Sequence, residues 1–239
     1  MKIALTSLSP ASHEAIRWNE AYAKSLGFPR LGVAETSCLA VVGGGSSIND
    51  RLDELRTFDG DIWAINGAFH WCRDHGIETR FFSLDPSEAV LPFCAGVRSA
   101  MLGMNCHPSV FDALRNADVE AVDLADFPTG PTTAASAPMI AINRGYRQVH
   151  FFGCEASFEG KTHVYGDFNR ENLMKVACNG RDFLTTIDMM MQVEHLGSLI
   201  RACQGVFVDR SGGLLGAYIA SPDIDVLAAT RSLHEAVNA

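Results

Sequence analysis

The strongest constraint on the fold is a regular alternation of short apolar segments with amphipathic stretches, which begins at residue 38. Apolar runs at 38–44 (CLAVVGG), 61–66 (DIWAIN) and 148–154 (QVHFFGC) are separated by segments with helical spacing. Short strands that alternate with helices are typical of βαβ units, in which both faces of a parallel sheet are covered. We therefore expect an α/β fold with a doubly wound, mainly parallel Rossmann-like sheet and helices on both faces.

The remaining segments are organised around this core, which we place at residues 38–218. Residues 1–36 are expected to be an N-terminal helical extension. Residues 155–181 are polar and show no periodic pattern, which predicts a long polar lid loop. The segment 181–203 has helical spacing throughout. With no internal repeat or linker in view, we expect one domain over 1–239.

Charge and composition exclude some classes of function. The formal net charge is -9 at pH 7, which disfavours a nucleic-acid binder because a phosphate backbone attracts clustered Lys and Arg. No apolar run has the length of a membrane span, and the first residues do not resemble a signal peptide. The seven cysteines form no CxxC pair and are expected as reduced thiols. We therefore expect a cytoplasmic protein without a membrane span.

Three consecutive glycines, Gly43, Gly44 and Gly45, stand where the first predicted strand ends, and Ser46 follows them. Ligands of doubly wound sheets bind beyond the carboxyl ends of the strands. Glycine lets backbone N–H groups approach an anion, and the helix that follows adds the favourable end of its dipole. The turn therefore predicts a phosphate site, and a tight turn without a ligand is the alternative.

Two common phosphate-binding motifs do not fit this turn. The Walker A loop requires a lysine after the glycines, and there is no lysine between Lys24 and Lys161. The dinucleotide fingerprint requires a third glycine where this chain has Ile48. It also requires an acidic residue after the second strand, where Asn66 stands.

Other polar residues are predicted to lie at the same edge of the sheet. Asn66 and Asp85 end the second and third predicted strands, and both residue types are also common in plain turns. Gly130, Thr132 and Thr133 stand at the start of a predicted helix, where free N–H groups and hydroxyls can hold an anion. Simple capping of that helix by threonine is the alternative.

Several segments, in this order, resemble one group of protein families. The segments are VVGGGSSIND, IWAINGA, FFSLDPS, GPTTAASAPMIAINRGYRQVHFFGCEASF, GKTHVYGD and VFVDRSGGLLGA. They resemble the archaeal 6-hydroxymethylpterin diphosphokinases of the MptE-like family and the bacterial motility accessory factors, which glycosylate flagellin. They are distantly similar to the bacterial sialyltransferases that use CMP-sialic acid. The resemblance covers roughly residues 38–218.

The resemblance implies a nucleotide site and two catalytic candidates. The nucleotide-binding positions that it implies are Gly43, Gly44, Gly45, Ser46, Asn66, Asp85, Gly130, Thr132, Thr133 and Gly153. The catalytic candidates are Glu155, which replaces the usual Asp of the family, and His163 in the loop after it.

The chemistry of these residues fits two kinds of transferase. For glycosyl transfer from a nucleotide sugar such as a CMP-sugar, His163 is the candidate general base because its ordinary pKa lies near neutrality. A surface histidine is the alternative. Lys161, Tyr165 and Arg170 share its loop and could neutralise phosphate charge.

Diphosphate transfer from ATP is the alternative reaction, and it would depend on Mg²⁺ held by Asp85 and Glu155. A non-catalytic nucleotide-binding protein is a third reading. In each case the expected partner is a small nucleotide, with an acceptor that the sequence does not identify. The sequence leaves a homo-oligomer open.

Overall fold

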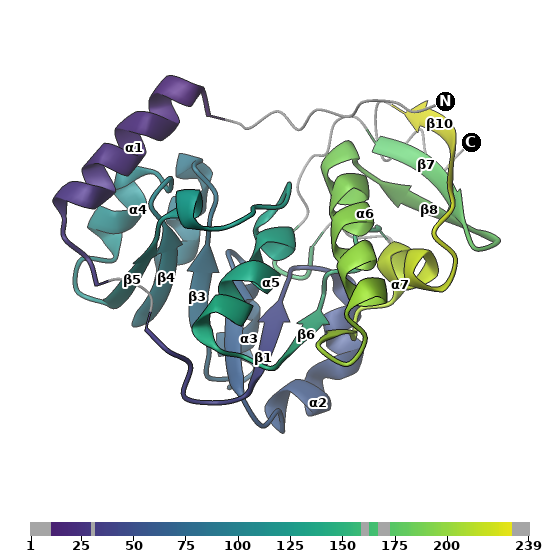
Figure 1. Ribbon diagram of the computed structural model, residues 1–239, viewed down its shortest axis with the longest axis horizontal. Coiled ribbons are helices and arrows are strands. Elements are labelled where there is room, and N and C mark those ends of the chain that lie inside the picture. The colour runs from purple at the N-terminus through teal and green to yellow at the C-terminus, as the bar shows by residue number, and fades with distance from the viewer. Residues whose placement is uncertain (1–10, 30–31, 159–162, 167–172, 231–239) are drawn as a thin grey trace.

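The computed structural model describes residues 11–29, 32–158, 163–166 and 173–230 (Figure 1). The helices are α1 (His13–Ser25), α2 (Leu52–Arg56), α3 (Ala68–Asp74), α4 (Pro108–Ala113), α5 (Thr133–Arg144), α6 (Ile187–Ala202) and α7 (Gly213–Ala220). Short 3-10 helices are η1 (Ser46–Arg51), η2 (Glu88–Cys94) and η3 (Leu124–Asp126). The strands are β1 (Cys38–Val42), β2 (Asp61–Ile65), β3 (Arg80–Ser83), β4 (Ser99–Gly103), β5 (Asp118–Val122), β6 (Gln148–Phe152), β7 (Leu173–Cys178), β8 (Arg181–Thr185), β9 (Phe207–Asp209) and β10 (Ile224–Thr230).

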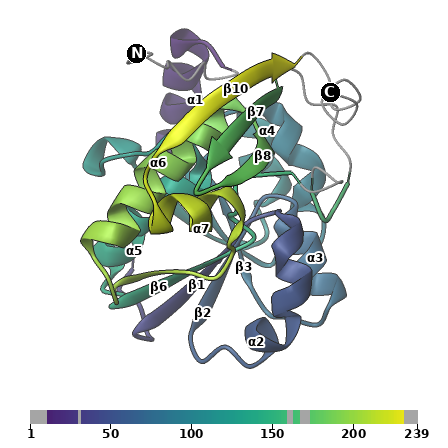
Figure 2. The same cartoon turned by 90° about the vertical axis from the view of Figure 1, so that its right-hand side faces the viewer.

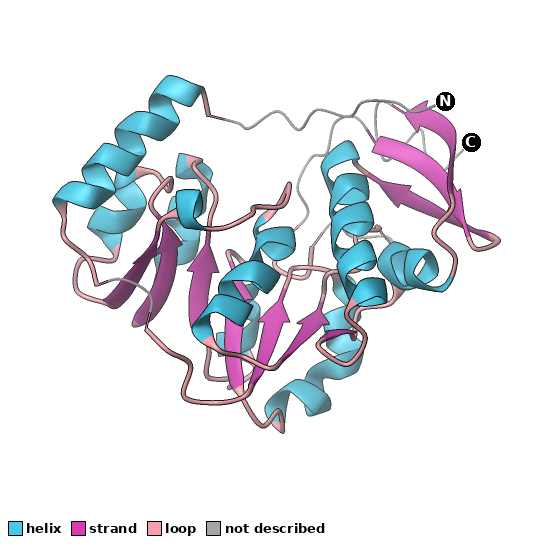
Figure 3. Cartoon of the chain, viewed as in Figure 1, coloured by secondary structure: helices cyan, strands magenta, loops and turns pink. Residues whose placement is uncertain are grey.

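The main sheet has seven strands in the order β5-β4-β3-β2-β1-β6-β9. Figure 3 shows strands in magenta with the helices around them in cyan. Every pairing in it is parallel. The chain starts in the middle at β1, runs outward to β5, and returns through α5 to β6 on the other side of β1. The strand order therefore reverses between β1 and β6, which is where a doubly wound sheet opens a crevice for a ligand. The predicted fold class is confirmed.

Alternation along β1 explains why both faces of the sheet are covered. Leu39 and Val41 lie in one hydrophobic core, and Ala40 and Val42 lie in the other. Successive side chains of a strand point to opposite faces, so a strand that is apolar throughout must be buried on both sides. The first core contains residues of α5, α6 and α7, and the second contains residues of α3 and α4.

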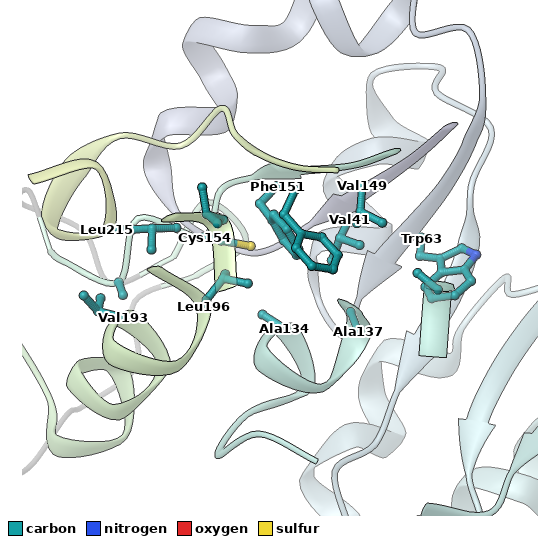
Figure 4. Close-up of a cluster of buried hydrophobic side chains, with 14 of the residues drawn as sticks. Val41, Trp63, Ala134, Ala137, Val149, Phe151, Cys154, Val193, Leu196 and Leu215 are labelled. Carbon is teal, nitrogen blue, oxygen red and sulfur yellow. The ribbon is translucent and has the colours of Figure 1, made fainter. Parts of the chain in front are cut away.

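One of these cores is shown in close-up in Figure 4. Ala134 and Ala137 of α5 belong to the same buried cluster as Val41 and Phe151 of the sheet. Their small side chains let the helix lie close to the strands, because little volume separates its backbone from the sheet. This packing directs the first turn of α5 toward the crevice between β1 and β6.

The expected structure of residues 155–203 needs correction. Leu173–Cys178 forms strand β7 within the segment predicted as a lid loop, and Arg181–Thr185 forms β8 where a helix was predicted. These strands and β10 make a separate antiparallel sheet in the order β10-β7-β8, beyond α7 (Figure 2). Asn179 and Gly180 both adopt positive φ, the geometry of a tight hairpin turn. The long-range pairing with β10 overrides the helical spacing of the sequence.

The N-terminal helix α1 forms as predicted and packs against α4. The hydroxyl oxygen of Ser12 accepts a hydrogen bond from the N–H of Ala15 at 3.2 Å and so caps the helix. Among the described residues, no helix combines the length and the apolar character needed to cross a bilayer.

A largely buried ion cluster joins the start of β3, strand β5 and the end of α5. The carboxylate of Glu120 accepts hydrogen bonds from Arg80 at 3.0 Å and from Arg144. The Arg144 side chain is 8% exposed, and those of Arg80 and Glu120 are 17% exposed. Two guanidinium groups therefore share one carboxylate in a poorly hydrated place.

We predict that Glu120→Gln lowers the free energy of unfolding by about 3 kcal/mol, because it leaves two buried cations without their shared anion. Urea denaturation measures this loss. Asp118→Asn is the control, since Asp118 lies 3.7 Å from Arg80 but its side chain is 75% exposed, and its loss should be much smaller. Equal losses in the two variants would contradict the role given to Glu120.

Candidate ligand-binding site

A cavity of about 760 Å³ lies at the carboxyl ends of the strands. Its wall contains residues that follow β1, β2, β3, β4 and β6, together with the first turns of α5 and α6. The volume is in the range of sites for small molecules and cofactors. The position is the one that the strand order predicts for a ligand.

The structure brings nearly all of the predicted site residues to this wall. Those that line the cavity are Gly43, Gly44, Gly45, Asn66, Asp85, Gly130, Thr132, Thr133, Gly153, Glu155 and His163. Ser46 does not line it: this residue starts η1, and its carbonyl accepts a hydrogen bond from Asn49 at 3.1 Å. Lys161 and Arg170 lie outside the described residues. Contacts of these residues with a nucleotide stay a prediction.

The glycine turn continues the pairing of β1 with β6. Gly43 donates its N–H to the carbonyl of Phe152 at 2.8 Å, and Gly45 donates to Gly153 at 2.9 Å. Two of the three glycine amides are thus already engaged and do not offer their protons to a phosphate. A Cβ atom on Gly43 would lie 2.4 Å from the carbonyl oxygen of Gly153. Glycine is needed here because two backbones approach closely.

The side chain of Glu155 holds the same turn from the other side. Its Oε1 accepts the backbone N–H of Ser47 at 2.9 Å, and its Oε2 accepts the Ser47 hydroxyl at 2.7 Å. A Cβ atom on Gly45 would lie 2.0 Å from Oε2, so only glycine leaves room for the carboxylate. Glu155 is 5% exposed and caps the start of η1. The candidate catalytic residue therefore has a structural task in this fold.

Two asparagines that follow strands line this cavity, and their side-chain oxygens are buried. The Oδ1 atoms of Asn66 and Asn105 have no hydrogen-bond partner within the described parts of the chain. Asn66 also adopts a left-handed φ of 48°. Buried acceptors without a partner and strained backbone both concentrate at binding sites, because a ligand supplies the missing contact.

Asn105 is held in place by two neighbouring segments. Its amide nitrogen donates to the carbonyl of Leu84 at 2.7 Å, and its own carbonyl accepts from Asn19 of α1 at 2.9 Å. Asn19 also reaches the carbonyl of Pro86 at 3.5 Å and is 2% exposed. Helix α1 therefore supports the loops that follow β3 and β4, although it lies outside the sheet.

Asp85 sits where a charge is costly. Burial raises the pKa of its carboxyl above the ordinary value, and the hydrogen bond that Oδ1 accepts from the N–H of Ser87 at 2.9 Å opposes this shift. A carboxyl with a raised pKa in a cavity is a candidate functional group, because side chains with shifted pKa values are concentrated at active sites.

The starts of α5 and α6 are tied together at the cavity. The hydroxyl of Thr132 accepts the N–H of Ala135 at 3.1 Å and donates to the side chain of Gln192 at 2.6 Å. Gln192 in turn donates to the carbonyl of Cys154 at 3.3 Å. The capping alternative therefore holds for Thr132. Thr133, one residue further, belongs to the first turn of α5, whose N–H groups lack acceptors within the helix.

Sequence reasoning missed several residues of this wall. Asn105 follows the fourth strand in the same way as Asn66 follows the second, so its position carried a usable signal. Thr186 and Gln192 were hidden because the predicted helix ran from 181, whereas α6 begins at Ile187 with Thr186 as its N-cap.

Metal binding by Asp85 and Glu155 stays a prediction. In the part of the chain that the structure describes, no group of three or more His, Cys, Asp or Glu gathers around a common point. Each oxygen of Glu155 already accepts a hydrogen bond from Ser47.

Comparison with known proteins supports the fold. No protein-family model and no curated protein matches the chain. Among solved structures, it is similar to the MAf glycosyltransferase from Magnetospirillum magneticum AMB-1, with a TM-score of 0.63 and 18% sequence identity. The match covers 88% of this chain but 38% of that one. At this identity the likeness shows a shared α/β fold, in agreement with the resemblance to motility accessory factors.

A second similar structure is a protein from Lactobacillus plantarum with 16% identity and a TM-score of 0.27. That match covers 53% of this chain and 50% of the other. Its TM-score is too low to bear on the fold.

We predict that Asp85→Asn is more stable than the natural protein at pH 7. The pKa of Asp85 is higher in the folded state than its ordinary value of 3.8, so its ionised form opposes folding above that folded pKa. The advantage of the variant should disappear as the pH falls through the folded pKa toward the unfolded one. Thermal melting between pH 7 and pH 4 measures both changes.

Asp112→Asn is the matched control, with the opposite sign. The hydroxyl of Tyr22 and the guanidinium of Arg115 lower the pKa of Asp112, so its ionised form favours folding. This variant should be less stable at pH 7, and the loss should persist down to pH 4, because the folded pKa lies below the ordinary value of 3.8. A destabilised Asp85→Asn at pH 7 would contradict the burial cost assigned to that carboxyl.

Proposed function

We propose that the cavity binds a nucleotide sugar and that the protein transfers the sugar to a hydroxyl acceptor. The observation that carries the proposal is the cavity between β1 and β6, in a fold similar to that of a glycosyltransferase. Two helix starts line its wall together with Asn66 and Asn105, whose side-chain oxygens have no hydrogen-bond partner among the described residues. The acceptors suit the hydroxyl and amino groups of a nucleoside, and helix starts suit a phosphate.

The transfer step uses the groups at the wall as follows. His163 takes the proton of the acceptor hydroxyl as its oxygen bonds to the anomeric carbon of the sugar. The bond between that carbon and the phosphate oxygen breaks, and the phosphate leaves with the electron pair. The N–H groups in the first turns of α5 and α6 that Thr132 and Thr186 do not already engage would stabilise the growing negative charge. Protons and electrons balance without a further reactant.

Two other functions use the same wall and differ in their ligands. Diphosphate transfer from ATP requires Mg²⁺ with the nucleotide. A non-catalytic nucleotide-binding protein requires neither a base nor an acceptor.

A binding panel tests the ligand class. Thermal shift with CMP, CDP, UDP, GDP and ATP, each with and without Mg²⁺, should show stabilisation by a nucleotide in the absence of metal. A shift with CMP alone would favour CMP-sugars as donors. Stabilisation only by ATP with Mg²⁺ would replace glycosyl transfer with diphosphate transfer. No shift with any nucleotide would remove both enzyme functions.

A variant pair tests the base. With CMP-sugars as donors, His163→Ala should reduce release of CMP at least ~100-fold, the usual contribution of a general base, while the melting temperature changes little. His13→Ala, on the exposed face of α1, is the control and should keep full turnover. Turnover of the His163→Ala variant at the natural rate would remove this residue from the mechanism.

A further inference from the structure

Gly44 and Gly67 enclose the ring of Tyr165. A Cβ atom on Gly44 would lie 2.4 Å from Cε1 of Tyr165, and one on Gly67 would lie 2.4 Å from Cδ2. Cε1 and Cδ2 stand on opposite sides of the ring, so the ring fills the whole space between the two glycines. We call this space, bounded by Gly44 and Gly67, the Tyr165 slot.

Further contacts fix the chain around the slot. The N–H of Val164 donates to the carbonyl of Gly44 at 3.0 Å. The ring of Phe93 meets that of Tyr165 edge-on, with centroids 5.5 Å apart and planes at 71°. Residues 163–166 are thereby docked on the ends of two adjacent strands, β1 and β2.

His163 depends on the same contacts. Its ring lies 5.0 Å from that of Tyr165 between centroids. A Cβ atom on Gly44 would also come within 2.8 Å of its Cδ2. Both rings line the cavity, so the place of the imidazole there is set by how deeply Tyr165 enters the slot.

The two glycines provide volume here, and backbone freedom is not their role. Gly67 has φ -63° and ψ -18°, a helical conformation that any residue adopts. Gly44 also lies outside the positive-φ region. A larger residue at either position would fill the space that the ring of Tyr165 occupies.

We infer that Tyr165 is a positioning residue, which holds His163 at the cavity through the slot formed by Gly44 and Gly67. The reaction that the imidazole serves rests on the proposed function, whereas its placement by Tyr165 is a property of the folded chain alone. Near-attack geometry is sensitive to displacements of about 1 Å, so loss of this ring would slow transfer without removing any reacting group.

A double-mutant cycle tests the slot without any ligand. Gly67→Ala in the natural protein should lower the melting temperature, because the added methyl displaces the ring. In a Tyr165→Ala background the same change should be neutral or raise the melting temperature, since alanine suits this helical backbone better than glycine. Additive effects of the two changes would contradict the claim that the ring of Tyr165 fills the slot. Gly216→Ala in α7 is the control and should act equally in both backgrounds.

The placement of the imidazole is read by NMR. The Hδ2 proton of His163 should show a nuclear Overhauser effect to the Hα protons of Gly44, which Tyr165→Phe preserves and Tyr165→Leu weakens. Since Phe keeps the ring and Leu keeps only bulk, this pair also serves if Gly67→Ala does not fold. An effect unchanged in Tyr165→Leu would overturn the inference.

Turnover provides the last readout and separates the two proposals. With a CMP-sugar as donor, Tyr165→Leu should lower kcat at least ~10-fold, with KM for the donor nearly unchanged, and Tyr165→Phe should restore kcat. A raised KM with natural kcat would instead make Tyr165 a donor contact and overturn its positioning role. If no nucleotide binds, the proposed function fails, while the cycle and the NMR pair still decide the placement.

Discussion

The close contact between the backbones of Gly43 and Gly153 is the constraint on which the site depends. It joins the carboxyl ends of β1 and β6 at the point where the strand order reverses. The hydrogen bonds of Gly43 and Gly45 extend the ladder past the last strand residues. The segments that follow stay linked, because Glu155 accepts two hydrogen bonds from Ser47 of η1. The residues of this junction line the cavity, so its wall on this side follows from the pairing.

Each glycine of the turn leaves room for a different neighbour. Gly43 faces a backbone, Gly44 faces two rings, and Gly45 faces a carboxylate. None of the three adopts positive φ. In phosphate-binding loops, glycine is usually explained by amides that point to an anion. Here the glycines are needed largely because groups from distant segments occupy the space that side chains would take. The anion at the turn is the carboxylate of Glu155, which belongs to the protein itself.

The parallel sheet and the positions of most wall residues could be predicted, because they depend on local patterns. Apolar runs of five residues identify strands, and a polar residue at the end of each run marks the shared edge. The hairpin of β7 and β8 could not be predicted, since its pairing with β10 joins residues about fifty positions apart. The roles of Glu155 and Thr132 were equally hidden. Their partners, Ser47 and Gln192, come close only in the folded chain.

Helix α1 shows how a segment outside the sheet can belong to the site. The buried amide of Asn19 satisfies the carbonyl of Asn105, and Ile16 on the same helix reaches the cavity wall. Shortening the chain to its Rossmann-like core would leave that carbonyl without its donor and open the wall to water. Any minimal version of the protein must therefore begin before the first strand. The boundary of the ligand site lies some twenty residues ahead of the boundary of the sheet.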